Sequence, residues 1–438
     1  MNRTSPGILS VPQALQHSNY KKTVLPNGIR IVSEEIPYVR SISVGFWIEV
    51  GSRDEHPENN GISHFLEHMV FKGTKRYSAQ QIARSLEGVG GYLNAFTTKE
   101  HTCFYARILD DHLPKAIDVI SELVQNPVFN VREMEKEKKV ILEELKNIED
   151  DPEELVHDYF DRRLFQDHPL GMPIIGRGES IQSFSRDDLK TYRQRHYAPA
   201  RMVVSAAGNL KHEKLVELVE RAFAGNGNGR SRLKRAAGLK RPKPEREVHE
   251  KPIMQAHVVT GTMGYSVLSK VRYTLLVLNT LLGEGMSSRL FQNIREKYGF
   301  AYSIFSFANL LSDTGNFGVY VGTDANNIGN SVELIYKELE HLRSKPIGDA
   351  ELRRTKAQLK GTMVLSLEST TNRMTRLGSG ELYFGAFVPI NQILTSIDAV
   401  SIGDVFELAK KLFQVEKFST VIIKPSGKAQ LAARAAVA

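Results

Sequence analysis

The chain has 438 residues, a formal net charge of +8 and a single cysteine, Cys103. Because this length exceeds the size at which one hydrophobic core stops growing, it predicts two or more domains. The single cysteine excludes a disulfide-stabilised scaffold, and no apolar run approaches the roughly 20 residues that cross a bilayer, so we expect no membrane partner.

Residues 1–22 predict a leader ahead of the first domain. They lack the charged-then-apolar order of a secretory signal, so we expect a cytoplasmic protein. A mitochondrial matrix location is the alternative, because no acidic residue precedes Glu34. Against it, Arg3 is the only basic residue before Lys21, and two prolines would interrupt an amphipathic helix.

The first domain is predicted over residues 23–224 and begins with strands. Residues 23–25 and 29–32 flank a Pro-Asn-Gly turn, which predicts a hairpin. Residues 41–50 predict a further strand that is largely apolar on both faces.

The segment HFLEH, residues 64–68, carries the clearest chemical signal. In a helix, His64 and His68 lie on one face and Glu67 lies beside them. Two neutral imidazoles and an adjacent carboxylate are what a catalytic zinc needs, as ligands and as a base for its water. The alternative is an amphipathic helix whose histidines hold no metal, and five residues alone leave both interpretations open.

Alternating helix and strand signals continue toward the middle of the chain. Helices are predicted at 78–89, 113–124 and 131–148, and strands at 91–97 and 102–109. A catalytic zinc takes three protein ligands, so a third one is expected outside HFLEH. Glu144 is the candidate, and Glu137 shares its helix face; for either glutamate a solvated charge is the alternative.

A basic linker is predicted over residues 225–252. The excess positive charge is concentrated in residues 230–246, between Gly/Asn-rich and Pro-rich stretches. Nucleic-acid binding would call for interleaved aromatic residues or a known motif, and the linker has neither. We therefore expect a solvated linker and no nucleic-acid partner.

The second domain, residues 253–427, repeats the first in outline and is followed by a tail, residues 428–438. Its predicted strands are 256–263, 303–310 and 316–323, and its predicted helices are 271–282, 328–343 and 349–367. It has no second HxxEH, and Thr362 falls near the position equivalent to Glu144. The predicted fold class is therefore α+β, with two similar domains that each consist of a mostly antiparallel sheet covered by helices.

Four segments occur in order in the first domain: HFLEH at 64–68, FKGT at 71–74, NAFT at 94–97 and EKKVILEE at 137–144. Together they resemble the pitrilysin/insulinase family of zinc metallopeptidases, in its mitochondrial-processing-peptidase-like branch with short bacterial members. The resemblance implies one Zn²⁺ per subunit, held by His64, His68 and Glu144. It further implies Glu67 as the catalytic base and Glu137 as a supporting carboxylate.

Several substrate-binding positions follow from the same resemblance. Glu154 and Asp158 correspond to an acidic pair that holds an arginine just ahead of the scissile bond, and an ordinary acidic surface is the alternative. Phe71 resembles the wall of the pocket for the residue after the cut. The edge strand expected to pair with an extended peptide comprises Leu93, Asn94, Ala95 and Phe96.

In the second domain, Arg295 and Tyr302 resemble the family's arginine and tyrosine that bond to the bound peptide and to the developing oxyanion. An exposed helix end and an ordinary strand tyrosine are the alternative. Family members of this length pair two subunits, so the resemblance implies a homodimer with an active site shared between subunits.

The function that the resemblance implies is a zinc-dependent endopeptidase. It would act on extended peptides, unfolded protein or presequence-like segments, with a preference for arginine before the cleavage site. The alternative is a catalytically inactive partner subunit of a heterodimeric peptidase or complex.

Overall fold

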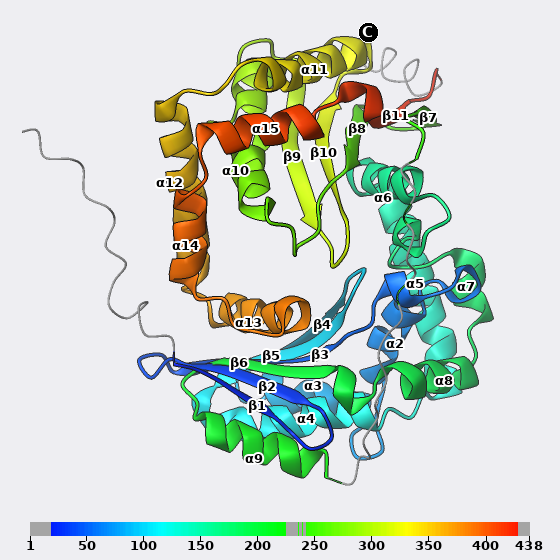
Figure 1. The fold of residues 1–438 in the computed structure, drawn as a ribbon. Helices are drawn as coiled ribbons and strands as arrows, with labels where there is room; N and C mark the ends of the chain where they lie inside the picture. The colour runs from blue at the N-terminus through cyan, green and yellow to red at the C-terminus, as the bar shows by residue number, and fades with distance from the viewer. Residues whose placement is uncertain (1–18, 225–234, 236–238, 240–241, 428–438) are drawn as a thin grey trace, which may run out of the picture.

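A computed structural model describes residues 19–224, 235, 239 and 242–427. Two sheet-based halves lie one above the other (Figure 1). They are connected on one side by α5 (Val131–Asp150) and α6 (Pro152–Phe165), and on the other by α12 (Asp349–Ser366), α13 (Thr370–Phe384) and α14 (Ile390–Asp398). The predicted C-terminal tail and nearly all of the predicted leader lie outside the described residues.

The first half is built on a six-stranded sheet in the order β1-β2-β6-β3-β5-β4. Only β2 and β6 are parallel, and every other neighbouring pair is antiparallel. Among the described strands, β4 pairs with β5 alone and is therefore an edge strand. The bounds are β1 Tyr20–Val24, β2 Arg30–Glu35, β3 Ser41–Ile48, β4 Tyr92–Thr97, β5 Thr102–Leu109 and β6 Met202–Gly208.

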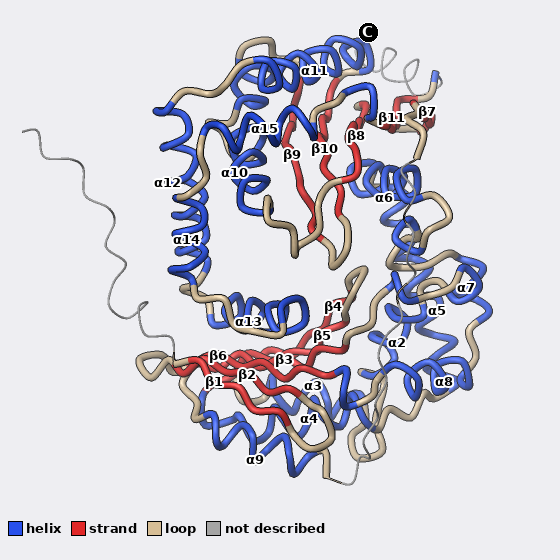
Figure 2. Tube along the Cα trace, in the orientation of Figure 1, coloured by secondary structure: helices blue, strands red, loops and turns tan. Residues whose placement is uncertain are grey.

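Helices cover one face of this sheet and bury their apolar sides in a common core with it (Figure 2). Most of these helices bury one apolar stripe and turn charged side chains to the surface, as an amphipathic pattern dictates, whereas no residue of the helix over 62–70 is exposed. The bounds are α2 Ile62–Val70, α3 Ala79–Glu87, α4 Leu113–Gln125, α5 Val131–Asp150, α7 Gly178–Ser183, α8 Arg186–His196 and α9 His212–Ala222.

The second half repeats this plan with a five-stranded sheet in the order β7-β11-β8-β10-β9. Only β7 and β11 are parallel, so the order and directions match β2-β6-β3-β5-β4 strand for strand. The strands are β7 Arg246–Lys251, β8 Ala256–Met263, β9 Ala301–Leu310, β10 Gly315–Thr323 and β11 Ser419–Pro425. This repeated topology confirms the predicted α+β fold of two similar, mostly antiparallel units.

The helices of the second half pack on one face of its sheet. They are α10 Arg272–Gly283, α11 Ile328–Ser344, α12 Asp349–Ser366, α14 Ile390–Asp398 and α15 Ile402–Leu412. A short π-helix, Phe291–Glu296, precedes β9. In the part of the chain that the structure describes, no helix has both the length and the apolar character needed to cross a membrane.

Two sheet strands extend into segments that the sequence analysis assigned elsewhere. β7 occupies 246–251, inside the predicted linker, and β1 begins at Tyr20, inside the predicted leader. β7 lies at a sheet edge and alternates between exposed and half-buried polar residues, so it lacks the apolar alternation that marks a strand in sequence.

In each half, one helix packs against the sheet of the other half. α6, Pro152–Phe165, comes from the first half and packs on β8 and β11 through an apolar cluster that includes Val156 and Phe160. α13, Thr370–Phe384, comes from the second half and packs Met374 and Leu377 against the first sheet. Separating the halves would therefore expose both clusters to water.

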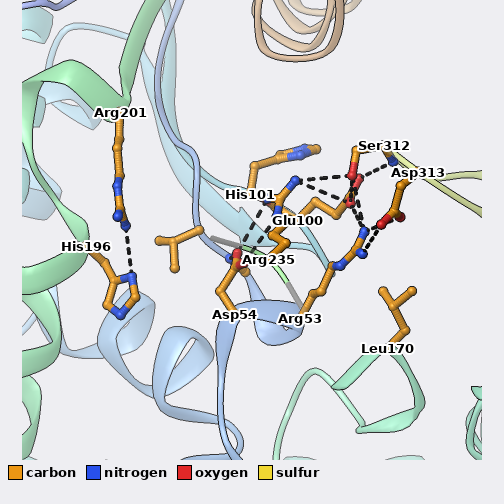
Figure 3. A network of polar contacts seen from close by, with 12 residues as sticks. Arg53, Asp54, Glu100, His101, Leu170, His196, Arg201, Arg235, Ser312 and Asp313 are labelled. Atoms are coloured by element: carbon orange, nitrogen blue, oxygen red, sulfur yellow. Dashed lines mark hydrogen bonds and ion pairs between the residues drawn. The ribbon is translucent and has the colours of Figure 1, made fainter. Parts of the chain in front are cut away.

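A buried polar network links loops of both halves (Figure 3). Arg53 is fully buried and donates to Glu100 at 2.6 Å and to the two carboxylate oxygens of Asp313 at 2.7 and 2.6 Å. Arg235 donates to Asp54 at 3.1 Å and to the carbonyl oxygen of Glu100 at 2.6 Å. Arg235 falls within the predicted solvated linker, so at this residue the expectation of a solvated side chain is wrong. Two carboxylates, those of Asp54 and Glu100, accept hydrogen bonds from its guanidinium.

Candidate metal centre

Helix α2 carries both histidines of HFLEH, and a glycine and a buried carboxylate define its N-terminal end. Gly61 precedes the helix at φ 95°, and a Cβ there would come within 2.6 Å of the carbonyl oxygen of Ile175. The buried Glu55 carboxylate accepts the backbone N–H groups of Gly61 at 2.7 Å and Ser63 at 2.9 Å. A carboxylate at this end satisfies free helix donors, which fixes where α2 begins.

Burial raises the pKa of Glu55 to about 7, although these donors oppose the shift. The sequence analysis missed this residue. It lies in the polar loop ahead of α2 and belongs to no periodic or chemical pattern that would single it out.

Three side chains from two helices bring their ligand atoms together. Nε2 of His64 lies 3.7 Å from Oε1 of Glu144, and Nε2 of His68 lies 3.7 Å from Oε2 of Glu144. All three ligand atoms lie within 4.8 Å of one another. Tetrahedral zinc, with bonds of about 2.0–2.2 Å, holds its donors roughly 3.4 Å apart, so this donor set fits such an ion with a small inward shift.

A carboxylate behind the cluster orients His68. Oε1 of Glu137 lies 2.9 Å from Nδ1 of His68, and Oε2 of Glu137 lies 2.7 Å from Nζ of Lys72. With Nδ1–H donated to Glu137, Nε2 carries the lone pair and faces Glu144. The Lys72 contact is a feature that the sequence analysis did not identify, although Lys72 lies within the FKGT segment.

The electrostatics of these groups favour neutral imidazole and ionised carboxylate. Burial, assisted by the neighbouring His68, lowers the pKa of His64 to about 3. Burial would raise the pKa of Glu137, but the hydrogen bonds from His68 and Lys72 outweigh it and lower that pKa. Metal binding needs both of these protonation states.

Glu67 lies beside the cluster and is held by the edge strand. Its Oε2 accepts a 2.5 Å hydrogen bond from the Thr97 hydroxyl at the end of β4. Burial raises the pKa of Glu67, against the opposing effects of Thr97 and His68. A half-buried carboxylate with a raised pKa beside two imidazoles is suited to proton transfer.

The predicted peptide-binding strand, residues 93–96, lies within β4 and is therefore at the free edge of the first sheet. β4 also contacts α2, the helix of the two histidines. Phe71 ends α2 and is half-buried, with its ring 6.4 Å from that of Phe104. The histidine helix, the free strand edge and Phe71 thus lie in one region.

Within the described residues, no direct polar contact joins the remaining predicted residues to this cluster: neither Arg295, Tyr302, Glu154 nor Asp158 has a hydrogen bond or ion pair with the two histidines or with Glu144. Tyr302 is 74% exposed on β9, and the exposed Arg295 places its guanidinium 4.6 Å from the ring of Phe291.

The predicted acidic pair lies on α6, the helix that follows the one carrying Glu144. Glu154 is exposed, and Asp158 is half-buried. Burial and the nearby Asp161 raise the pKa of Asp158, while Lys99 opposes them.

Comparison with known proteins identifies the family to which the chain is similar. Residues 30–178 match the family model described as "Insulinase (Peptidase family M16)", and residues 183–359 match "Peptidase M16 inactive domain". The chain is 42% identical over 409 residues to "Uncharacterized zinc protease YmxG" of Bacillus subtilis, covering 93% of this chain and 98% of that protein. A Streptomyces coelicolor protein named as an uncharacterized zinc protease is 40% identical, with 89% and 86% covered.

Solved structures agree with these sequence matches. The chain superposes with a TM-score of 0.88 on a structure titled as a protease from Helicobacter pylori, at 25% identity, covering 93% of this chain and all of that one. A Pseudomonas fluorescens structure titled as a peptidase M16 inactive domain gives a TM-score of 0.87 at 20% identity, covering 93% of this chain and 98% of that one. The chain belongs to the insulinase family of peptidases, family M16. The resemblance inferred from its four sequence segments is thereby confirmed.

Proposed function

We propose that the protein is a zinc-dependent endopeptidase that hydrolyses extended peptides. The observation that carries this proposal is the convergence of His64, His68 and Glu144 with a half-buried carboxylate, Glu67, beside them. Relatives of at least 38% identity that bear the name zinc protease support the choice of metal. The mixed set of two imidazoles and one carboxylate is also the donor set of catalytic zinc peptidases.

The protein's own groups supply the proton transfers. When bound, zinc contributes Lewis acidity and brings the pKa of a water molecule toward about 7. Glu67 takes the proton of the attacking water through the carboxylate oxygen that Thr97 leaves free, and later gives it to the leaving amine. Glu137 keeps His68 in the tautomer whose Nε2 can act as a ligand.

Substrate would bind as an added strand along β4. The unpaired N–H and C=O groups of this edge fix the register of a peptide without selecting its side chains. Phe71 would form a wall for the residue after the cut. Extended or unfolded segments can pair in this way, whereas a folded protein offers few free strands.

The site would be completed by a second copy of the chain. Arg295 and Tyr302 are exposed, and within the described residues neither side chain has a hydrogen bond or ion pair. A cation and a phenol with free donors suit the developing oxyanion and the peptide backbone. We propose a homodimer in which these two groups face the zinc ligands of the partner.

Removing the metal should remove activity. We expect the purified protein to contain about one zinc per chain, and chelation to abolish peptide cleavage until zinc is restored. Glu144→Gln should weaken zinc binding by more than the roughly 10- to 100-fold lost on removing an outer-shell partner. Zinc affinity by chelator competition and cleavage of a fluorogenic peptide measure the two effects.

Glu143→Gln is the matched control, because it removes the neighbouring charge. Among the residues that the structure describes, Glu143 forms its ion pair with the exposed Lys146. It should keep wild-type zinc affinity. A zinc-free, inert wild type would contradict the proposal and favour the alternative, an inactive partner subunit.

Glu154 and Asp158 of α6 would give the site a preference for substrates with an arginine ahead of the scissile bond. Two carboxylates can hold an arginine guanidinium ahead of the scissile bond. Glu154→Gln combined with Asp158→Asn should lower the kcat/KM ratio between an arginine-bearing peptide and its glutamine counterpart by about 10-fold, since hydrogen bonds to charged groups contribute roughly 1.5–3 kcal/mol. Glu149→Gln with Asp150→Asn, an equal charge change at the exposed end of α5, should leave the ratio unaltered. An unchanged ratio in the α6 variant would contradict the assignment.

A further inference from the structure

We propose that Thr97 is a positioning residue that ties the catalytic base to the peptide-binding strand. Thr97 is the last residue of β4, and its hydroxyl donates to Oε2 of Glu67 at 2.5 Å. Within the described part of the chain, this is the only hydrogen bond to the Glu67 side chain. The inference rests on the proposed peptidase function and adds a residue to it.

The direction of the hydroxyl proton follows from its neighbours. An ionised carboxylate only accepts hydrogen bonds, so Thr97 must be the donor to Glu67. The Thr102 hydroxyl lies 3.4 Å from that of Thr97 and donates to the carbonyl oxygen of Val50 at 3.0 Å. Each threonine proton is therefore committed to a different acceptor, and the contact with Thr102 does not compete with Glu67.

This arrangement leaves the two oxygens of Glu67 in different roles. Oε2 is held by Thr97, while Oε1 remains available to a water at the metal centre. Two further groups near this carboxylate, Cys103 and Tyr197, are buried, and burial together with the Glu67 charge raises the pKa of each, so both stay neutral. The hydrogen bond from Thr97 therefore determines which oxygen faces the reaction.

The same threonine belongs to the strand that would receive the substrate. β4 is in register with β5, with Thr97 opposite Thr102, so its backbone is fixed on one side and free on the other. A peptide that pairs with the free side is thereby placed in register with Thr97. Because Thr97 also holds Glu67, the same residue fixes the position of the base relative to the scissile bond. Catalysis requires reacting groups to be held in a defined geometry of this kind.

Thr97→Val tests this inference. Valine keeps the β-branched shape and strand preference of threonine but removes the hydroxyl. We expect kcat to fall roughly 10- to 100-fold, the range that small misplacements of a catalytic group cost. KM should change less than about twofold, because main-chain pairing along β4 is kept. Zinc affinity by chelator competition and the thermal unfolding midpoint should match the wild type.

Thr97→Ser is the control, because serine retains the donor and loses only a methyl group. Its kcat should stay within a few-fold of the wild type. Wild-type kcat in Thr97→Val, or an equal loss in Thr97→Ser, would overturn the positioning role. Lowered zinc affinity in Thr97→Val would also overturn it, because the residue would then act through the metal ligands. An inert wild type would instead overturn the proposed function and this inference with it.

Discussion

Glu67→Gln should lower kcat for peptide cleavage by roughly 10²- to 10⁴-fold, the contribution typical of a general acid–base residue. Glutamine has the same size and can accept the Thr97 hydrogen bond through its amide oxygen, so the local packing is kept. The amide cannot take a proton from water at neutral pH. The loss should therefore appear in kcat while zinc remains bound.

Steady-state cleavage of a fluorogenic peptide, together with metal analysis of the same sample, measures this effect. Glu87→Gln, an exposed glutamate at the end of α3, serves as a control for the loss of one charge and should keep full activity. Full cleavage by Glu67→Gln would rule out the proposed role of this carboxylate.

The local elements of the chain could be predicted from sequence because their signals are local. The strand predicted at 256–263 has these same bounds in the structure. The helix predicted from residue 78 also begins there, since Ser78 is the N-cap of α3 and accepts the N–H of Gln81. The two-histidine face of α2 also followed from helical spacing alone. These features depend on residues within one or two turns of each other.

The proposed third ligand, Glu144, could not be derived in this way. Glu144 lies on a different helix from His64, and in sequence it is one glutamate among many in an acidic segment. The sequence offered Glu144 as a candidate but left a solvated charge open as the alternative, and the resemblance to a known family decided between the two. Long-range convergence of this kind depends on how α5 packs against α2, which no local pattern encodes.

The features that sequence analysis missed share this dependence on distant partners. α13 was not predicted, and its apolar face is buried by the sheet of the other half. Arg235 lies in a charge-rich stretch, and its carboxylate partners come from a loop and a hairpin far away in the chain. A charged residue has the same appearance in sequence whether it is solvated or buried in a network.

Two inactive variants, mixed as unfolded or dissociated chains and allowed to reassemble, should recover activity if the site is shared between subunits. One variant carries Glu67→Gln, and the other carries Arg295→Ala with Tyr302→Phe. Each homodimer has two defective sites. In a mixed dimer, one site combines both defects and the other combines the intact Glu67 of one chain with the intact Arg295 and Tyr302 of its partner.

Random pairing through a two-fold interface makes half of the dimers mixed, so about a quarter of the wild-type activity should return. Cleavage assays on the mixture and on each variant alone measure this recovery, and light scattering establishes that the samples are dimers. Recovery requires the exposed Arg295 and Tyr302 to act on the metal centre of another chain, since in a self-contained subunit both variants stay defective in any mixture. A mixture as inactive as its components, with mixed dimers present, would place the whole site within one chain. Arg295 and Tyr302 would then have to reach His64 and His68 of their own chain, with which they make no direct polar contact within the described residues.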